Sequence, residues 1–278
     1  MNNAAKNRFK RLGSRVSSLL RVYMNSHTDP RLIRELVDRL VPYDLGIPLR
    51  RVGGSADGGY LIPDDLDDLE CCFSPGVADT ASFEKELYDM GIRSYLADYS
   101  VAGPPAALPD CDFEKKFVGA VTANNVITLD DWVAEKCPPG SSRDLILQMD
   151  IEGAEYETIL ATSPETLARF RIIVIELHKF SHLGNRLFFR FVHAAISKLL
   201  DQFEIAHLHA NNAGGLTPMA GIEIPRVVEL TFFRKDRVVK KSPVAGLPHV
   251  LDAPNVRDQA ELILPTYWWN PDAMQRAA

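Results

Sequence analysis

Between residues 69 and 234, short apolar runs alternate with longer stretches in which apolar residues recur at helical spacing. Runs of this kind predict buried strands, and the stretches between them predict helices. Strands that alternate with helices imply right-handed crossovers and a mainly parallel sheet, with ligands bound at the carboxyl ends of the strands. The expected strands are 69–73, 94–97, 117–121, 145–149, 172–177, 205–209 and 227–234, and the expected helices are 81–90, 129–136, 155–162 and 187–202.

The N-terminal region carries two further helical patterns. Residues 1–28 contain no acid, and their apolar residues recur at helical spacing, which predicts a cationic amphipathic helix. Such a helix can lie on an anionic membrane surface, but we favour packing on its own domain or on a partner subunit. Asp29 as a cap and Pro30 as the first helical residue predict a second helix over 29–40. We therefore expect a helical N-terminal extension over 1–45 and one main domain over 46–278.

Composition and charge narrow the class of protein. The 278 residues have a formal net charge of -6, which argues against nucleic acid as a partner, because a long nucleic-acid footprint needs clustered Lys and Arg. The four cysteines form no C-x-x-C pair, so the sequence suggests neither a thiolate zinc site nor a disulfide framework. No run approaches the roughly 20 apolar residues that span a bilayer. We expect a soluble cytoplasmic protein, with peripheral membrane contact open only through the basic helix.

A tight turn and an acid follow the first two predicted strands. The turn is Ser74-Pro75-Gly76-Val77-Ala78-Asp79, and Asp98 ends the second strand. A nicotinamide enzyme is expected to place G-x-G-x-x-G here, because a pyrophosphate lies against bare backbone and a helix N-terminus. One glycine and an aspartate suit a cationic sulfonium and an amino group better, so the loop favours S-adenosylmethionine. Taken alone, the same loop also fits an ordinary strand-to-helix turn.

A more specific motif closes the fourth predicted strand. Asp150-Ile151-Glu152-Gly153-Ala154-Glu155 matches, at every place, the D-[IV]-E-G-A-E signature of the FkbM methyltransferases. The chain resembles this family over roughly residues 50–235. Weaker matches are the loop 76–79 with Ser82-Phe83-Glu84, and the segment Thr128-Leu129-Asp130.

The resemblance implies a Rossmann-like class I methyltransferase α/β fold. This fold has a seven-stranded, mostly parallel sheet whose last strand, here 227–234, runs antiparallel, and we expect N-terminal helices in addition. It also implies S-adenosyl-L-methionine as cofactor, with Asp98 on the ribose and Asp150 facing the reaction centre. The glycine-rich segment 51–60 either caps the cofactor or forms a simple hairpin turn. The residues expected to bind the cofactor are Ser74, Gly76, Val77, Asp79, Phe83, Asp98, Tyr99 and Asp150.

Methyl transfer to a hydroxyl requires alignment of the acceptor and usually a general base. The expected catalytic residues, all at strand ends, are Asp150, His178 and His209, and His207 is expected to be structural. Residues expected to bind the acceptor are Glu152, Glu176, Asn211 and Asn212. Asp150, Glu176, His178 and His209 are also candidates for a divalent metal site, although a hydrogen-bonded acid-base cluster needs no ion.

The function expected from the resemblance is O-methylation of a glycan or another polar small molecule. Two alternatives stay open at this point. One is a nicotinamide-dependent oxidoreductase on a similar sheet, which the absent G-x-G-x-x-G disfavours, and the other is a non-catalytic module that binds the cofactor or a glycan. The aromatic tail 265–271 either stacks on sugars or docks the C-terminus, and we favour docking.

Overall fold

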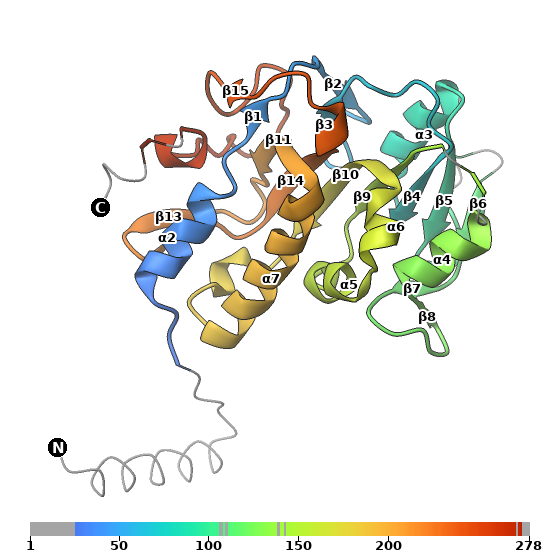
Figure 1. The fold of residues 1–278 in the computed structure, drawn as a ribbon, viewed down its shortest axis with the longest axis horizontal. Helices are drawn as coiled ribbons and strands as arrows, with labels where there is room; N and C mark the ends of the chain where they lie inside the picture. Colours follow the sequence, from blue (N-terminus) through green and yellow to red (C-terminus); the bar gives the residue numbers. More distant parts are fainter. Residues whose placement is uncertain are drawn as a thin grey trace, which may run out of the picture.

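The computed structural model describes residues 26–105, 108, 111–137, 140–141, 143–270 and 272–273. The predicted basic helix of residues 1–28 lies almost entirely outside this range. In the described part, seven strands form one sheet in the order β11-β14-β10-β9-β4-β5-β6 (Figure 1). Only β14 runs antiparallel to its neighbours, so the predicted mostly parallel sheet with an antiparallel last strand is confirmed. The strands are β4 (Cys71–Pro75), β5 (Arg93–Ala97), β6 (Asp112–Glu114), β9 (Leu145–Met149), β10 (Phe170–Leu177), β11 (Phe203–Ala210) and β14 (Val228–Arg234).

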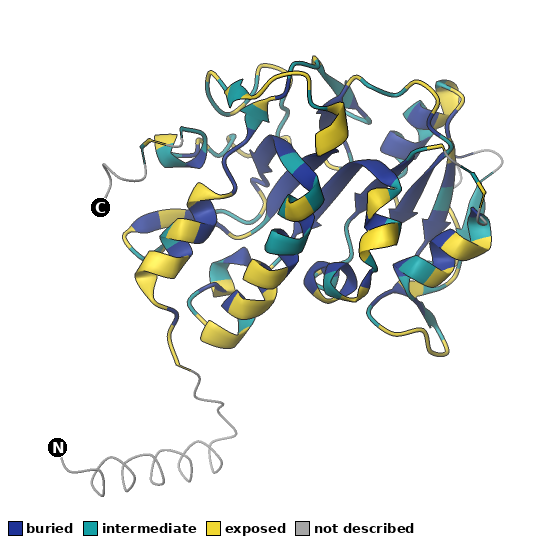
Figure 2. Cartoon of the chain, viewed as in Figure 1, coloured by how far each residue is buried: buried dark blue, intermediate teal, exposed yellow. Residues whose placement is uncertain are grey.

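Helices cover the sheet because alternate strand residues point to opposite faces. In β9, Leu145 and Leu147 join the larger core, which also contains the apolar residues of α2, α4, α5, α6 and α7. Ile146 joins a second core with Phe83 of α3 on the other face. The strands are accordingly buried, whereas the helices expose their outer sides (Figure 2). The helices are α2 (Pro30–Asp38), α3 (Ser82–Asp89), α4 (Leu129–Lys136), α5 (Glu155–Ala161), α6 (Pro164–Ala168) and α7 (Arg186–Gln202).

Short strand pairs complete the described fold. The glycine-rich segment 51–60 forms the turn of an antiparallel hairpin between β2 and β3, which covers part of the second core. The bounds of all the short pairs are β1 (Tyr43–Asp44) with β15 (Ser242–Pro243), β2 (Leu49–Val52) with β3 (Tyr60–Pro63), β7 (Phe117–Val118) with β8 (Val126–Ile127), and β12 (Leu216–Met219) with β13 (Ile222–Pro225). Single 3-10 turns are η1 (Phe180–His182), η2 (Lys235–Arg237) and η3 (Thr266–Trp268).

The prediction of the third sheet strand was wrong. The apolar run 117–121 contributes only the two-residue strand β7, and the edge position of the sheet belongs to β6. The acids of β6 are stabilised there by Lys136 of α4, which lies 3.2 Å from Asp112 Oδ1 and 2.9 Å from Glu114 Oε1. An edge strand can carry charges in this way because one side of it faces solvent.

Both ends of the described chain pack on the domain. Asp29 caps α2 by accepting a hydrogen bond from the Arg31 N–H (2.9 Å), and Pro30 is its first residue, as predicted. Leu36 of α2 belongs to the main core, and the division of the chain at residue 45 stays a prediction. Trp268 is fully buried and its Nε1–H donates to the Glu223 carbonyl (3.0 Å), which confirms that the C-terminal region docks. Within the described residues, no helix has the length and apolar character needed to cross a bilayer.

Candidate active site

A cavity of about 500 Å³ opens at the carboxyl ends of β4, β5 and β9. It is lined by the loops after these strands, the start of α3, β7 and β8, and the turn of the β2–β3 hairpin. This is the edge at which open α/β sheets bind ligands, and the volume lies in the range of small-molecule sites. The hairpin turn contributes Asp57, Gly58 and Tyr60, so the glycine-rich segment is a hairpin whose turn also lines the cavity.

Backbone hydrogen bonds join the three strand ends beneath the cavity. The Gly76 N–H donates to the Ala97 carbonyl (2.9 Å), and the Asp150 N–H donates to the Pro75 carbonyl (3.2 Å). Gly76 has a φ of +88°, a conformation that glycine adopts without steric cost. The loops after β4, β5 and β9 are thereby held in fixed positions around one space.

Asp98 shapes the wall of the cavity. Its Oδ2 accepts a hydrogen bond from the Ala78 N–H (2.9 Å), and its Oδ1 accepts from the Ser100 N–H (2.7 Å) and hydroxyl (2.6 Å). The side chain lines the cavity although the residue is only 5% exposed. Asp98 therefore ties the loop after β4 to the loop after β5 and still presents acceptor lone pairs to a ligand.

Five of the eight residues predicted to bind the cofactor line the cavity, and their roles stay predictions. These are Gly76, Val77, Phe83, Asp98 and Asp150. The other three lie elsewhere in the described structure. Ser74 is buried beneath the cavity, Asp79 is exposed, and the Tyr99 ring lies outside the lining with its centroid 5.2 Å from that of Phe117.

A chain of buried polar groups underlies the cavity floor. The Ser74 hydroxyl is hydrogen-bonded to Glu84 and donates to Gln148 Oε1 (2.7 Å), and Gln148 Nε2 donates to the Tyr60 hydroxyl (3.2 Å). Burial raises the pKa of Glu84 above its ordinary value. The sequence analysis missed Tyr60 and Gln148, although a glutamine in the otherwise apolar strand 145–149 was a usable signal.

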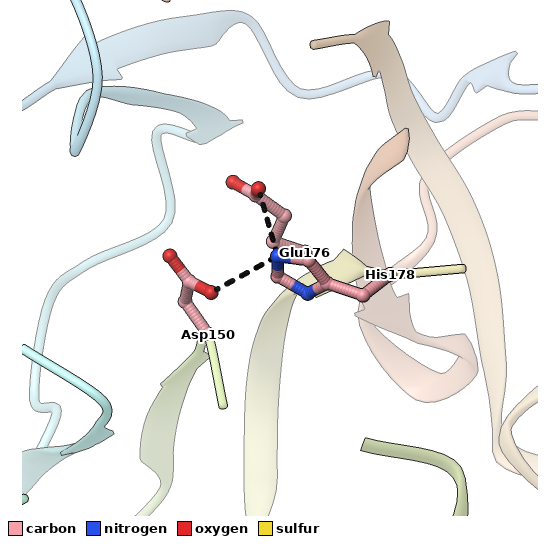
Figure 3. Close-up of side chains that lie close together, drawn as sticks. All are labelled: Asp150, Glu176 and His178. Atoms are coloured by element: carbon pink, nitrogen blue, oxygen red, sulfur yellow. Dashed lines mark ion pairs between the residues drawn. The ribbon is translucent and has the colours of Figure 1, made fainter. Parts of the chain in front are cut away.

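His178 and two acids meet at the ends of β9 and β10, beside the cavity (Figure 3). His178 Nδ1 lies 2.9 Å from Glu155 Oε1, which also accepts hydrogen bonds from the N–H groups of Ile151 (3.3 Å) and Gly153 (2.9 Å). Because Glu155 is fixed by these donors, it fixes the imidazole in turn. His178 Nε2 then faces three carboxylates, at 3.8 Å from Asp150 Oδ1, 3.4 Å from Glu176 Oε1 and 3.5 Å from Glu152 Oε2.

Burial and like charges shift the pKa values in this cluster. Burial raises the pKa of Asp150 and of Glu176, and the other acids nearby add to both shifts. Burial alone would lower the pKa of His178, but the hydrogen bond to Glu155 and the surrounding carboxylates raise it above its ordinary value. The protonation of each of these residues therefore depends on the charge of the other two.

His209 does not fit its predicted role as a base. Its Nδ1 lies 3.0 Å from Glu229 Oε2 and its Nε2 lies 2.8 Å from Glu261 Oε1. Burial opposes the charge, but these two hydrogen bonds raise the pKa of His209 to about 10. Both nitrogens are thus protonated and engaged at neutral pH, and neither can accept a proton or bind a metal. His207 pairs with Asp252 (2.8 Å), in agreement with a structural role.

The two predicted asparagines have different surroundings. Asn211 Nδ2 donates to Glu176 Oε1 (3.2 Å), which brings it to the acidic cluster. Asn212 instead holds the C-terminal segment 249–261: its Oδ1 accepts from the Val256 N–H (2.8 Å) and its Nδ2 faces nearby carbonyls of that segment. Both ends of the Asn212 amide are therefore occupied, contrary to the expected contact with the acceptor.

Of the four metal candidates, Asp150, Glu176 and His178 bring one possible ligand atom each within 4.8 Å of one another, and His209 is outside this group. Sequence reasoning missed Glu229, although an acid within the apolar strand 227–234 is itself a signal of a paired buried group. It also missed Asn255 and Glu261, for which the irregular C-terminal segment offers no periodic pattern.

Comparisons with known proteins cover part of the chain. Residues 84–204 match the model of the methyltransferase FkbM domain. A search among curated proteins found no match. Among solved structures, the chain is similar to magnesium protoporphyrin IX methyltransferase (ChlM) from Synechocystis PCC 6803 with bound SAH, at 14% identity and a TM-score of 0.32, over 62% of this chain and 76% of that one. The domain match over residues 84–204 confirms the resemblance carried by Asp150–Glu155 and agrees with methyl transfer that depends on S-adenosylmethionine.

Proposed function

Because this chain carries a methyltransferase FkbM domain, we propose that it methylates a hydroxyl group of a glycan or another polar metabolite, with S-adenosylmethionine as methyl donor. The observation that carries the choice of a hydroxyl is the Glu155–His178 pair. It directs an imidazole nitrogen at Asp150 on the border of the cavity. A hydroxyl must lose its proton as it attacks, and this arrangement supplies a group that takes it.

The cavity fits the cofactor on three grounds. Gly76 brings bare backbone to the end of β4, Asp98 offers a buried carboxylate to ribose hydroxyls, and the acidic surroundings suit a cationic sulfonium. When bound, S-adenosylmethionine supplies the electrophilic methyl group. The residues that would hold it are Gly76, Val77, Phe83 and Asp98.

The reacting end of the site handles the proton. With S-adenosylmethionine held there, the acceptor oxygen would take up its methyl group, the cofactor would leave as a neutral thioether, and the hydroxyl would have to give up its proton. The hydroxyl proton passes to the pair formed by Asp150 and His178, whose Oδ1 and Nε2 atoms are 3.8 Å apart. Glu155 fixes the tautomer and orientation of the ring, as the carboxylate does in other His-carboxylate pairs.

Polar groups at the mouth of the site favour a polar acceptor. Asp57 and Glu152 are exposed, and the Glu152 side chain is 86% accessible. Carboxylates accept hydrogen bonds from neighbouring hydroxyls, so a polyol or sugar suits this end of the cavity.

The test combines binding and turnover. Calorimetry is expected to show S-adenosylhomocysteine binding and no NAD binding, and a methyl-transfer screen against sugars and polyols is expected to identify an acceptor. His178→Gln should lower kcat about 100-fold or more while S-adenosylhomocysteine affinity changes little, since its interaction develops with the attacking hydroxyl. The matched control is His207→Gln, which alters a histidine paired with Asp252 outside the cavity lining.

Three results would contradict the proposal. Tight NAD binding would favour an oxidoreductase, and cofactor binding without transfer to any hydroxyl compound would favour a non-catalytic module. Unchanged turnover in His178→Gln would remove this histidine from proton transfer.

A further inference from the structure

Three carboxylates converge behind the reacting end of the cavity. Asp57 of the hairpin turn, Glu176 of β10 and Glu229 of β14 each bring an oxygen within 4.8 Å of the other two. Glu176 and Glu229 stand directly opposite each other on antiparallel strands and are only 5% and 6% exposed. Like charges in this position repel, and their burial makes the repulsion stronger.

One oxygen in this group lacks any partner among the described residues. Glu176 Oε1 accepts from Asn211 (3.2 Å) and faces His178 Nε2 (3.4 Å), whereas Glu176 Oε2 is buried without a hydrogen bond. Figure 3 shows that one carboxylate oxygen of Glu176 faces the imidazole and that the other points away from it. A buried carboxylate oxygen without a hydrogen bond lowers the stability of the fold, and a bound ligand would remove this penalty.

Within the part of the chain that the structure describes, the neighbouring side chains donate no hydrogen bond to Glu176 Oε2. Glu229 Oε2 faces His209 Nδ1 (3.0 Å) and Glu229 Oε1 accepts from Asn255 Nδ2 (2.5 Å), which also lies 3.2 Å from Asp57 Oδ1. These contacts fix the positions of two of the carboxylates. They bring no donor to Glu176 Oε2.

We propose that Asp57, Glu176 and Glu229 bind a hard divalent cation such as Mg²⁺, Mn²⁺ or Ca²⁺. An all-oxygen set of carboxylates is what these ions prefer, and each carboxylate oxygen keeps lone pairs beyond its present hydrogen bonds. His209 is not a ligand, because both of its nitrogens are engaged.

The burial of these carboxylates favours a metal ion as their ligand over an ammonium group of the acceptor. Of the three acids, only Asp57 lines the cavity. Glu176 and Glu229 are almost completely buried and do not line it. A bare ion needs no room for a carbon skeleton, whereas an amine on a sugar or polyol does. An ion in this position lies next to the reacting end, where it can hold an acceptor hydroxyl and lower its pKa.

Binding by the full-length protein tests the site without using turnover. After chelator treatment, titration with Mn²⁺ followed by electron paramagnetic resonance, and with Mg²⁺ and Ca²⁺ by calorimetry, is expected to show one ion per chain. Asp57→Asn and Glu229→Gln are each expected to weaken binding at least about tenfold. Asp57 is exposed, so its variant is expected to fold, and circular dichroism checks this for both. Glu204→Gln, at a carboxylate on β11 paired with Lys241, is the matched control that keeps wild-type affinity.

The variants also locate the ion. Loss of binding in Asp150→Asn and His178→Gln, with full binding in Asp57→Asn, would move the ion to the neighbouring Asp150–Glu176–His178 group and overturn this assignment. Absence of binding at millimolar concentrations of all three metals would overturn it as well, as would protection of the fold by methylammonium and not by any divalent ion. These results do not depend on methyl transfer, so they can fail while the proposed function holds.

Discussion

A Cβ atom built on Gly76 would lie 1.6 Å from the carbonyl oxygen of Asp150. The turn after β4 and the end of β9 are therefore in direct backbone contact, and no side chain fits between them. This contact brings the predicted cofactor loop against the motif that carries the family resemblance.

Gly76→Ala is accordingly expected to unfold the protein or destabilise it by several kcal/mol, because the new methyl group must displace backbone. Gly91→Ala is the matched control: its φ of +83° is nearly the same as the +88° of Gly76, but a Cβ there meets nothing within 4 Å. The control should cost only about 1 kcal/mol. Urea denaturation of both variants measures the difference, and equal losses would show that the close approach to Asp150 is unimportant.

Asp98→Ala is expected to weaken S-adenosylhomocysteine binding by about 1–3 kcal/mol, the scale of losing hydrogen bonds to a charged group. Part of the loss comes from release of the loops held at Ala78 and Ser100. Ser100→Ala removes only the hydrogen bond from the Ser100 hydroxyl (2.6 Å) and keeps the carboxylate and both backbone hydrogen bonds, so it should bind nearly as well as wild type. Calorimetry measures the S-adenosylhomocysteine affinity of both variants. Unchanged affinity in Asp98→Ala would exclude this residue from the cofactor site.

Glu155→Gln is expected to lower kcat about tenfold to 100-fold with little change in cofactor affinity, because the imidazole of His178 loses its fixed tautomer. The double variant with His178→Gln should be no slower than His178→Gln alone, since the two residues act as a unit. Steady-state kinetics at several pH values tests this. Glu165→Gln, at an exposed acid of α6, is the control. Additive losses in the double variant would contradict a shared role.

Asp144 provides a prediction on stability and pH. Burial opposes its charge, but hydrogen bonds from Arg234 (2.6 Å) and Arg171 (2.9 Å) hold the pKa of Asp144 below its ordinary value. A lowered pKa stabilises the fold above the unfolded value near 3.8, and this stabilisation disappears as the pH falls through the folded value.

Asp144→Asn should therefore reduce the free energy of unfolding by about 1–2 kcal/mol from pH 5 to 8, and by progressively less below about pH 4. Asp89→Asn, which breaks an exposed pair with Lys85, should cost at most about 0.5 kcal/mol. Denaturation series across pH test both. A loss for Asp144→Asn that grows on acidification would have the wrong sign for this explanation.

Local signals in the sequence predicted several elements closely. The helix 129–136 was predicted with its observed bounds, because Thr128 caps it by accepting from the Asp131 N–H (3.1 Å) and the apolar spacing that follows is regular. The strand 145–149 was equally clear, since all of its residues are buried and the apolar run has sharp ends. The third strand failed because β6 is charged and is stabilised by Lys136, a contact that its own sequence does not encode.

The sequence by itself determined the alternation of strands and helices, the turn at Gly76, the acid at Asp98 and the motif 150–155, because each depends on residues close together in the chain. Only the tertiary structure decided which of the acids and histidines work together. It placed Glu155 behind His178, and it enclosed His209 between Glu229 and Glu261, so that one imidazole faces Asp150 beside the cavity and the other is held by two carboxylates. Protonation states depend on burial and on the distance to other charges, and here the carboxylates that face the two imidazoles lie 20 to 52 positions away in the chain.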